Sequence, residues 1–283
     1  MVRILLTGGG TGGHVFPLVA VAQRIKKVAA EKGMDMELKY FGPENIYDAY
    51  FVQENITISR VLGAKLRRYF SLLNLIDFPK LIISVFQSLW KVFWWRPNVT
   101  FSKGGPGALP VLFACHLYKI PIIIHESDTI PGMTNRISGR WAKKVELGWQ
   151  KAVSYFPNKE VEVVGIPLRE EIAEKINFEQ RKAKEFFKFN LNEPLILVVG
   201  GSQGAQRVNE FILANLEKLL PKFQILHQVG SVNYESYKKI YEQLKEKWPP
   251  ELRHASETKY QIWAFFEKNM DEAYAASDLI ISR

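Results

Sequence analysis

Two segments of the sequence share one order, in which an apolar strand leads into a glycine turn and then into a helix. The first copy spans residues 4–14 and the second spans residues 195–205. Glycine has no Cβ, so such a turn can take positive φ and bring its backbone close to a ligand. The amides at the start of the following helix favour an anion there. The repeat therefore predicts two Rossmann-like halves, each with a glycine loop able to hold a phosphate.

The length and the other apolar runs agree with an α/β fold built from two domains. A chain of 283 residues exceeds the usual size of one hydrophobic core. Continuous apolar runs at 121–124 and 278–281 are typical of strands buried on both faces of a parallel sheet. A change from strand-like to charged helical sequence predicts domains at 1–163 and 164–283.

The net charge of +9 favours an anionic partner, such as a nucleotide, a pyrophosphate, an acidic membrane surface or nucleic acid. The sequence has no zinc-finger spacing, homeodomain pattern or RNA-recognition motif, so we expect no nucleic-acid partner. Cys115 is the single cysteine and lies in an apolar context. We interpret it as a buried, inert thiol in a reducing cytoplasm.

Residues 72–95 are rich in leucine, isoleucine, phenylalanine and tryptophan, but polar and charged residues interrupt the run. This pattern does not predict a spanning helix. Aromatic residues flanked by Lys65, Arg67, Arg68 and Arg96 are typical of a surface that dips into lipid headgroups. The alternative is an ordinary core helix. We expect one face of the helix in the core and an exposed aromatic, basic edge at the membrane.

His14 closes the first glycine loop at the start of a helix predicted over residues 17–30. The helix dipole there lowers the pKa of an imidazole and favours the neutral form, which can act as a base. An equally good interpretation is that His14 only hydrogen-bonds the loop backbone.

Two further strand ends carry candidate residues. Lys103 adds a cation before Gly104 and Gly105, although this loop can equally be a plain turn. At the end of the buried strand 121–124, Glu126 or Asp128 can bind sugar hydroxyls or accept a proton. The alternative there is helix capping, with Ser127 or Asp128 bonding nearby amides.

Four motifs, at 9–17, 125–135, 164–169 and 200–205, occur in the order found in one enzyme family. Over essentially its whole length the sequence resembles the MurG family of bacterial peptidoglycan N-acetylglucosaminyltransferases. The resemblance implies a GT-B fold, which has two Rossmann-like domains around a cleft. It also implies that neither a metal nor a cofactor is required.

The family's reaction moves N-acetylglucosamine from UDP-N-acetylglucosamine to the C4 hydroxyl of the muramic sugar in undecaprenyl-linked lipid I, with inversion. The resemblance implies a peripheral protein at the cytoplasmic face of the bacterial cell membrane, in contact with its anionic surface. His14 is then the leading general base and Glu126 its rival. The other implied residues are Thr11, Gly12, Gly13, Asp128, Arg169, Ser202 and Gln203 for the donor, and Gly10, Gly104, Gly105 and Asn135 for the acceptor.

This sequence departs from the family pattern in three places. Asp128 replaces an asparagine of some members, and the loop at 104–107 lacks the usual aromatic residue. The sequence also ends on the strand at 278–283, where the family continues into a further loop and helix. We therefore expect an incomplete second domain and weak turnover. The alternatives are a transferase acting on another membrane lipid, such as diacylglycerol, and a membrane-associated binding module.

Overall fold

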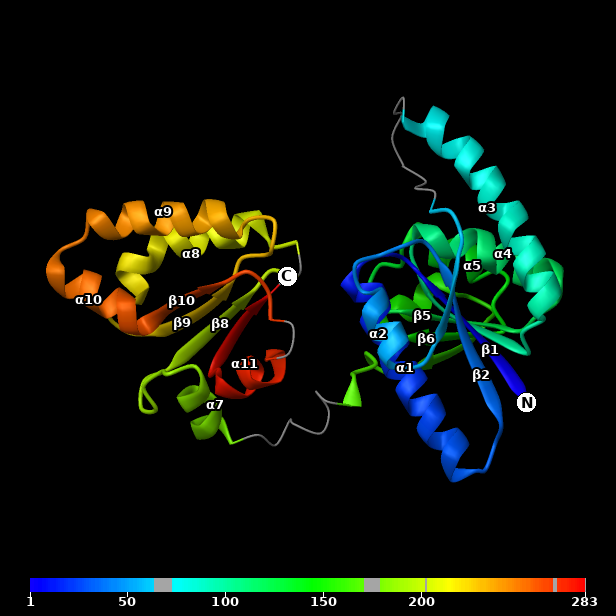
Figure 1. The fold of residues 1–283 in the computed structure, drawn as a ribbon, viewed down its shortest axis with the longest axis horizontal. Helices are drawn as coiled ribbons and strands as arrows, with labels where there is room; N and C mark the ends of the chain where they lie inside the picture. The colour runs from blue at the N-terminus through cyan, green and yellow to red at the C-terminus, as the bar shows by residue number, and fades with distance from the viewer. Residues whose placement is uncertain (64–72, 171–178, 202, 267–268, 283) are drawn as a thin grey trace. The chain divides into compact units, whose positions relative to one another are not determined.

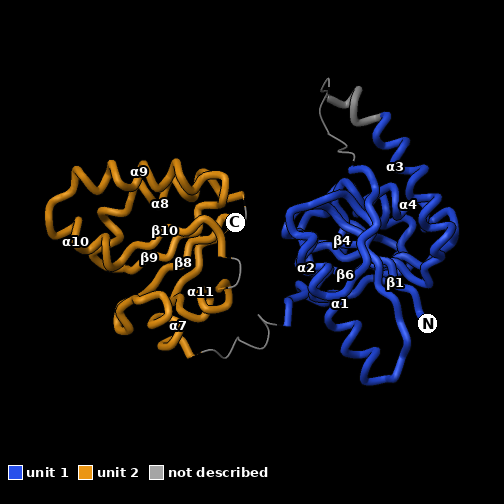
Figure 2. Tube along the Cα trace, viewed as in Figure 1, with its two compact units in different colours: residues 1–170 blue, residues 171–283 orange. Residues whose placement is uncertain are grey.

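The computed structural model describes residues 1–63, 73–170, 179–201, 203–266 and 269–282. The chain forms two compact units, residues 1–170 and 171–283 (Figure 2). The change in composition predicted a boundary after residue 163. Residues 164–170 instead group with the first unit, because the amide of Val164 donates to the carbonyl of Leu147 and the amide of Glu170 donates to Gln23.

The first unit is a seven-stranded sheet in the order β3-β2-β1-β4-β5-β6-β7 (Figure 1). All of its pairs are parallel. The strand order reverses between β1 and β4, and ligands of such sheets bind beyond the carboxyl ends of the strands at this point. The strands are β1 (Val2–Gly8), β2 (Met36–Gly42), β3 (Thr57–Arg60), β4 (Val99–Gly104), β5 (Ile122–Glu126), β6 (Lys144–Leu147) and β7 (Glu160–Val163).

Helices cover both faces of this sheet, so neighbouring residues of β1 enter different cores. Leu6 packs with α1 and α2, whereas Leu5 packs with α3 and α4. This explains why the strand sequence is apolar without alternation. The helices are α1 (Gly12–Glu31), α2 (Asp48–Gln53), α3 (Leu73–Trp95), α4 (Leu109–Leu117) and α5 (Met133–Ser138), with short 3-10 helices η1 (Pro106–Ala108) and η2 (Gln150–Tyr155).

The second unit has a four-stranded parallel sheet in the order β10-β9-β8-β11. The prediction of two Rossmann-like halves with parallel sheets is therefore confirmed. Its strands are β8 (Leu195–Val199), β9 (Gln224–Gln228), β10 (Tyr260–Trp263) and β11 (Leu279–Ser282). Its helices are α7 (Gln180–Phe186), α8 (Gln206–Leu219), α9 (Tyr234–Glu246), α10 (Pro250–Lys259) and α11 (Met270–Ala276).

Helix α1 begins at Gly12, earlier than the predicted start at Pro17. The amides of a first helical turn have no partners within the helix, so glycines can occupy it without losing hydrogen bonds. Pro17 lies inside the helix and removes a single amide donor. His14 consequently lies within the first turn of α1.

Helix α3 has one buried and one exposed face, as the sequence predicts. Ser84, Ser88 and Val92 are buried, whereas Trp90 is 67% exposed. No helix in the described part of the chain has the length and apolar character needed to cross a membrane. The flanking cations at 65, 67 and 68 lie outside the described residues.

Candidate active site at the carboxyl ends of β1, β4 and β5

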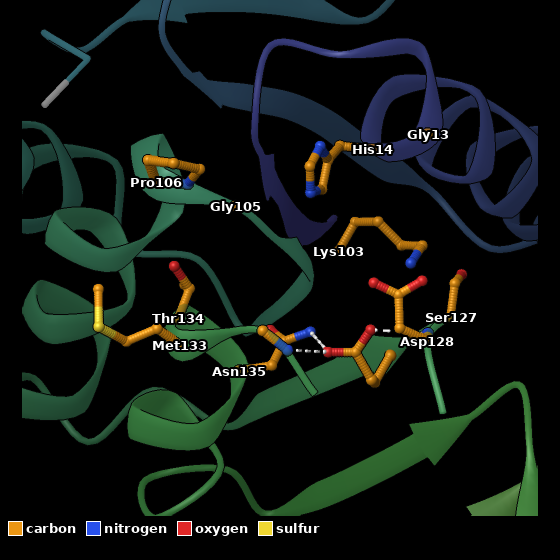
Figure 3. A pocket seen from close by; sticks show the side chains of 12 residues that line it. Gly13, His14, Lys103, Gly105, Pro106, Ser127, Asp128, Met133, Thr134 and Asn135 are labelled. Atoms are coloured by element: carbon orange, nitrogen blue, oxygen red, sulfur yellow. Dashed lines mark hydrogen bonds between the residues drawn. The ribbon is translucent and has the colours of Figure 1, made fainter. Parts of the chain in front are cut away.

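A pocket of about 410 Å³ opens where the strand order of the first sheet reverses (Figure 3). Three chain segments build it, each following or ending a central strand. The loop after β1 and the start of α1 supply His14, the end of β4 supplies Lys103, and the loop after β5 supplies Asp128. The lining residues are Gly13, His14, Lys103, Gly105, Pro106, Glu126, Ser127, Asp128, Gly132, Met133, Thr134 and Asn135.

His14 is fixed by the residue that precedes the helix. Its Nδ1 lies 2.7 Å from the hydroxyl of Thr11, which makes no capping hydrogen bond to the helix. When Nδ1 donates to that hydroxyl, Nε2 is left as the acceptor. Burial lowers the pKa of His14, and the positive charge of Lys103 lowers it further. The carboxylates of Glu126 and Asp128 act in the opposite direction. The net effect favours a neutral imidazole.

Glu126 is 5% exposed and holds the loop that follows β5. One carboxylate oxygen accepts the amide of Asp128 at 2.9 Å. The other accepts the amide of Gly132 at 3.0 Å and Nδ2 of Asn135 at 3.0 Å. The capping interpretation of this strand end named Ser127 or Asp128 as the acceptor. The observed acceptor of the loop amides is Glu126.

Lys103 is a buried cation in the wall of the pocket, with 4% of its surface exposed. Its ammonium group has no hydrogen-bond or ion-pair partner within the described ranges. Burial lowers the pKa of Lys103, while the charges of Glu126 and Asp128 raise it. The sequence pattern predicts a cation beside the glycine loop at Lys103 but does not place it in the site. Its position, directly before two glycines at a strand end, was the available signal.

The glycines at the end of β4 and directly after it allow the three segments to approach one another. Gly104 has φ +81°, and a Cβ there would lie 2.5 Å from Oδ1 of Asn135. Gly105 has φ +90°, and a Cβ there would lie 2.7 Å from the Cα of Gly9 and 3.0 Å from Nε2 of His14. Asn135 is 3% exposed, and its Oδ1 has no partner among the described residues.

His125 is a structural residue beside the pocket. Its Nε2 lies 2.8 Å from the carbonyl oxygen of Gly165, to which it donates as a neutral imidazole. Burial lowers the pKa of His125 to about 4. The contact fixes the segment that leads to Arg169.

The residues that line the pocket do not include the other predicted residues that the structure describes. Gly10 faces Asn45, and Gly12 faces the ring of Phe16. Arg169 lies on the first unit against Phe16. Gln203 is exposed on the second unit, and Ser202 is outside the described residues. The described residues contain no group of three or more His, Cys, Asp or Glu side chains arranged to hold a metal.

Comparison with known proteins places the chain in a family. Residues 4–147 match the glycosyltransferase family 28 N-terminal domain, and residues 195–283 match the glycosyltransferase family 28 C-terminal domain. This chain belongs to glycosyltransferase family 28. The resemblance inferred from the motifs is thereby confirmed.

Several family 28 relatives carry one name, UDP-N-acetylglucosamine–N-acetylmuramyl-(pentapeptide) pyrophosphoryl-undecaprenol N-acetylglucosamine transferase. The protein of that name from Clostridium botulinum strain Hall is 34% identical over 100% of this chain and 73% of its own length. The Clostridium tetani protein is 35% identical over 82% of this chain and 63% of its own length.

Solved structures agree with this assignment. The MurG crystal structure from Acinetobacter baumannii has a TM-score of 0.64 and 25% identity over 100% of this chain and 73% of that chain. A UDP-GlcNAc 2-epimerase from Neisseria meningitidis has the same TM-score at 13% identity, over 100% of this chain and 77% of its own, and shows the fold alone.

Proposed function

We propose that this chain transfers N-acetylglucosamine from UDP-N-acetylglucosamine to the C4 hydroxyl of the muramic sugar in undecaprenyl-linked lipid I. The products are lipid II and UDP. The observation that carries the proposal is the imidazole of His14, which lies in a pocket with Lys103 and Asp128. Over its whole length, this chain is 34% identical to a transferase named for this reaction.

We assign the general base to His14. Its Nε2 takes the proton of the acceptor hydroxyl while the hydroxyl oxygen attacks the anomeric carbon, and the bond from that carbon to UDP breaks with inversion. The positive charge then formed on His14 is stabilised by the nearby carboxylates of Glu126 and Asp128, which act on the imidazole through space. Glu126 itself is occupied by three N–H donors, which supports a role in positioning the loop.

The departing UDP carries negative charge, which helix N-termini and arginine can stabilise. We assign Arg169 and the loop at Gln203 to the donor, in agreement with the family resemblance. Gly12 and Gly13, in the first turn of α1, contribute amides that have no partner within the helix. Asn135, with its unpaired Oδ1 among the described residues, is assigned to the acceptor sugar.

We propose that the exposed face of α3 docks on the membrane that holds the lipid substrate. Its aromatic rings form one cluster with Tyr118, which follows α4: the centroids of Trp90 and Trp94 are 5.6 Å apart, and those of Phe93 and Tyr118 are 6.0 Å apart. The exposed cation Arg96 lies beside this cluster and suits anionic lipid headgroups at the cytoplasmic face. We call this surface the aromatic face; its exposed apolar residues are Ile82, Ile83, Phe86, Trp90, Phe93, Trp94, Leu117 and Tyr118.

Transfer of labelled N-acetylglucosamine tests the reaction. We expect product with a lipid I analogue and none with diacylglycerol or without acceptor. His14→Ala should lower kcat by about 10²–10⁴-fold. His254→Ala is the matched control, because His254 is exposed on the second unit. Transfer to diacylglycerol would contradict the assigned acceptor, and binding of lipid I without any transfer would indicate a binding module.

Vesicle sedimentation tests the docking surface. Replacing Trp90 and Trp94 together by serine should weaken binding to vesicles containing phosphatidylglycerol by about tenfold or more, because two exposed rings no longer enter the interface. Trp149→Ser is the control, since Trp149 is 53% exposed elsewhere on the unit. Equal binding of both variants would contradict the assignment.

A further inference from the structure

Two aromatic rings hold Arg169 against the first unit. The guanidinium carbon lies 4.7 Å from the centroid of the Phe16 ring and 5.6 Å from that of Tyr50. The two rings pack edge to face at 5.1 Å and 84°. We call this pair the Phe16–Tyr50 platform. Phe16 follows His14 by two positions on α1, so one helix carries both the proposed base and half of the platform.

A third aromatic ring packs against the platform. Tyr47 packs against Phe16 with centroids 5.2 Å apart. Gly12 leaves room for the ring, because a Cβ at that position would lie 3.0 Å from Cε2 of Phe16. The ring of Phe16 therefore packs against both Tyr47 and Tyr50 and occupies the space beside Gly12.

Stacking on the two rings leaves the edge of the guanidinium free of the platform. Stacking uses the face of an arginine, whereas its five N–H groups lie around the edge and bind phosphate in a bidentate manner. Within the described part of the chain, Arg169 makes no hydrogen bond or ion pair. A fixed cation whose donors have no partner among the described residues is organised to bind an anion before that anion arrives.

The backbone on both sides of Arg169 is also tied to the first unit. After it, the amide of Glu170 donates to Oε1 of Gln23 at 3.1 Å, and Lys27 lies 3.8 Å from the Glu170 carboxylate. Before it, the carbonyl of Gly165 accepts from His125. These contacts, with the stacking on Phe16, place Arg169 beside the start of α1.

We propose that Phe16 and Tyr50 are positioning residues that fix Arg169 for binding the diphosphate of the sugar-nucleotide donor. The inference rests on the proposed function, since it takes the anion to be that of the donor. The platform acts on donor affinity through Arg169 and leaves the acceptor hydroxyl and its base untouched.

The experiment measures UDP binding to the full chain by calorimetry, together with KM for both substrates. Tyr50→Leu, which removes the ring but keeps an apolar side chain, should weaken UDP binding by about three- to fivefold. The KM for UDP-N-acetylglucosamine should rise, with the KM for a lipid I analogue unchanged. Tyr50→Phe should restore wild-type affinity. Tyr155→Leu is the matched control, because Tyr155 stacks with Arg136 at 5.0 Å and not with Arg169.

A second arm tests whether the effect passes through Arg169. In an Arg169→Met background, Tyr50→Leu should change UDP affinity by less than about twofold, because coupled residues are not additive. The proposal is overturned by a wild-type chain that does not bind UDP, by equal UDP affinity in Tyr50→Leu and wild type, or by additive effects in the double variant. Titration with a short-chain prenyl pyrophosphate distinguishes the donor diphosphate from the acceptor pyrophosphate. If the platform variants lose affinity for the prenyl pyrophosphate and keep their affinity for UDP, the donor assignment is wrong.

The two proposals fail in different ways. If the wild-type chain transfers N-acetylglucosamine to lipid I but Tyr50→Leu binds UDP as well as wild type does, the role of the platform is wrong and the proposed reaction is retained. If Tyr50→Leu loses UDP affinity but the wild-type chain does not transfer N-acetylglucosamine to lipid I, the proposed reaction is wrong and the role of the platform is retained.

Discussion

Replacement of Glu126 distinguishes a residue that orders the loop from one that takes the proton. Oε2 accepts two of the three hydrogen bonds and Oε1 accepts the third. In Glu126→Gln, the amide oxygen can best occupy the Oε2 position, so the NH₂ group then faces the amide of Asp128, which is also a donor. One charge-assisted bond is lost and the other two are weakened.

A hydrogen bond to a charged group contributes about 1.5–3 kcal/mol, so we expect Glu126→Gln to lower the free energy of unfolding by about 2 kcal/mol. Glu126→Ala leaves all three donors without their acceptor and should cost about 4 kcal/mol. For a unit of this size, about 2 kcal/mol corresponds to a fall in melting temperature of about 4–8 °C.

Circular dichroism during heating and hydrogen exchange of peptides covering residues 127–133 measure these effects. The amides of Asp128 and Gly132 should lose protection in both variants. Glu146→Gln is the control, because Glu146 lies on the neighbouring strand β6 and, among the described residues, its carboxylate pairs with Lys144 alone, at 3.9 Å. If the melting temperature and the protection stay unchanged while turnover falls by about a hundredfold or more, the positioning role is refuted and Glu126 is the base.

Three further outcomes follow from the geometry. The pKa of His14 is lowered by burial and by Lys103, so kcat/KM should fall only below pH 6.5. Lys103→Met removes one of these causes and should move the acid limb of the pH–rate profile to higher pH. An unmoved limb would exclude electrostatic coupling between Lys103 and His14. Gly104→Ala should destabilise the chain by about 2 kcal/mol in urea unfolding, because its φ is +81° and the Cβ meets Asn135, whereas Gly132→Ala has open space and should be neutral. Burial raises the pKa of Cys115 to about 12, so iodoacetamide should label it only after unfolding, and rapid labelling of the native chain would contradict its burial.

Local sequence patterns predicted the secondary structure, because each helix, strand or turn depends mainly on residues close together in the sequence. Continuous apolar runs identified β5 and β8, since a strand covered on both faces has no polar side. The run at 278–281 also forms a strand, β11, but the expectation that it is buried on both faces is wrong, because Leu279 is 54% and Ile280 is 44% exposed. The two glycine turns predicted that a helix follows each of them, α1 and α8, although α1 begins at Gly12 and not at the predicted Pro17. The alternation of apolar and polar residues in α3 predicted a helix with one face in the core.

The order of the strands decided the rest, and sequence patterns do not encode it directly. Lys103 meets His14 and Asp128 only because β4 lies between β1 and β5, which joins segments separated by tens of residues. Glu126 became the acceptor of the loop amides because the chain after β5 folds back over its carboxylate.

The sequence by itself therefore determined the fold class, the two glycine turns between strand and helix, and the family. The tertiary structure alone decided which side chains share the pocket and which aromatic rings hold Arg169. The physical reason is range: helix and strand periodicity follow from residues a few positions apart, whereas burial, desolvation and stacking arise from contacts made across the sheet.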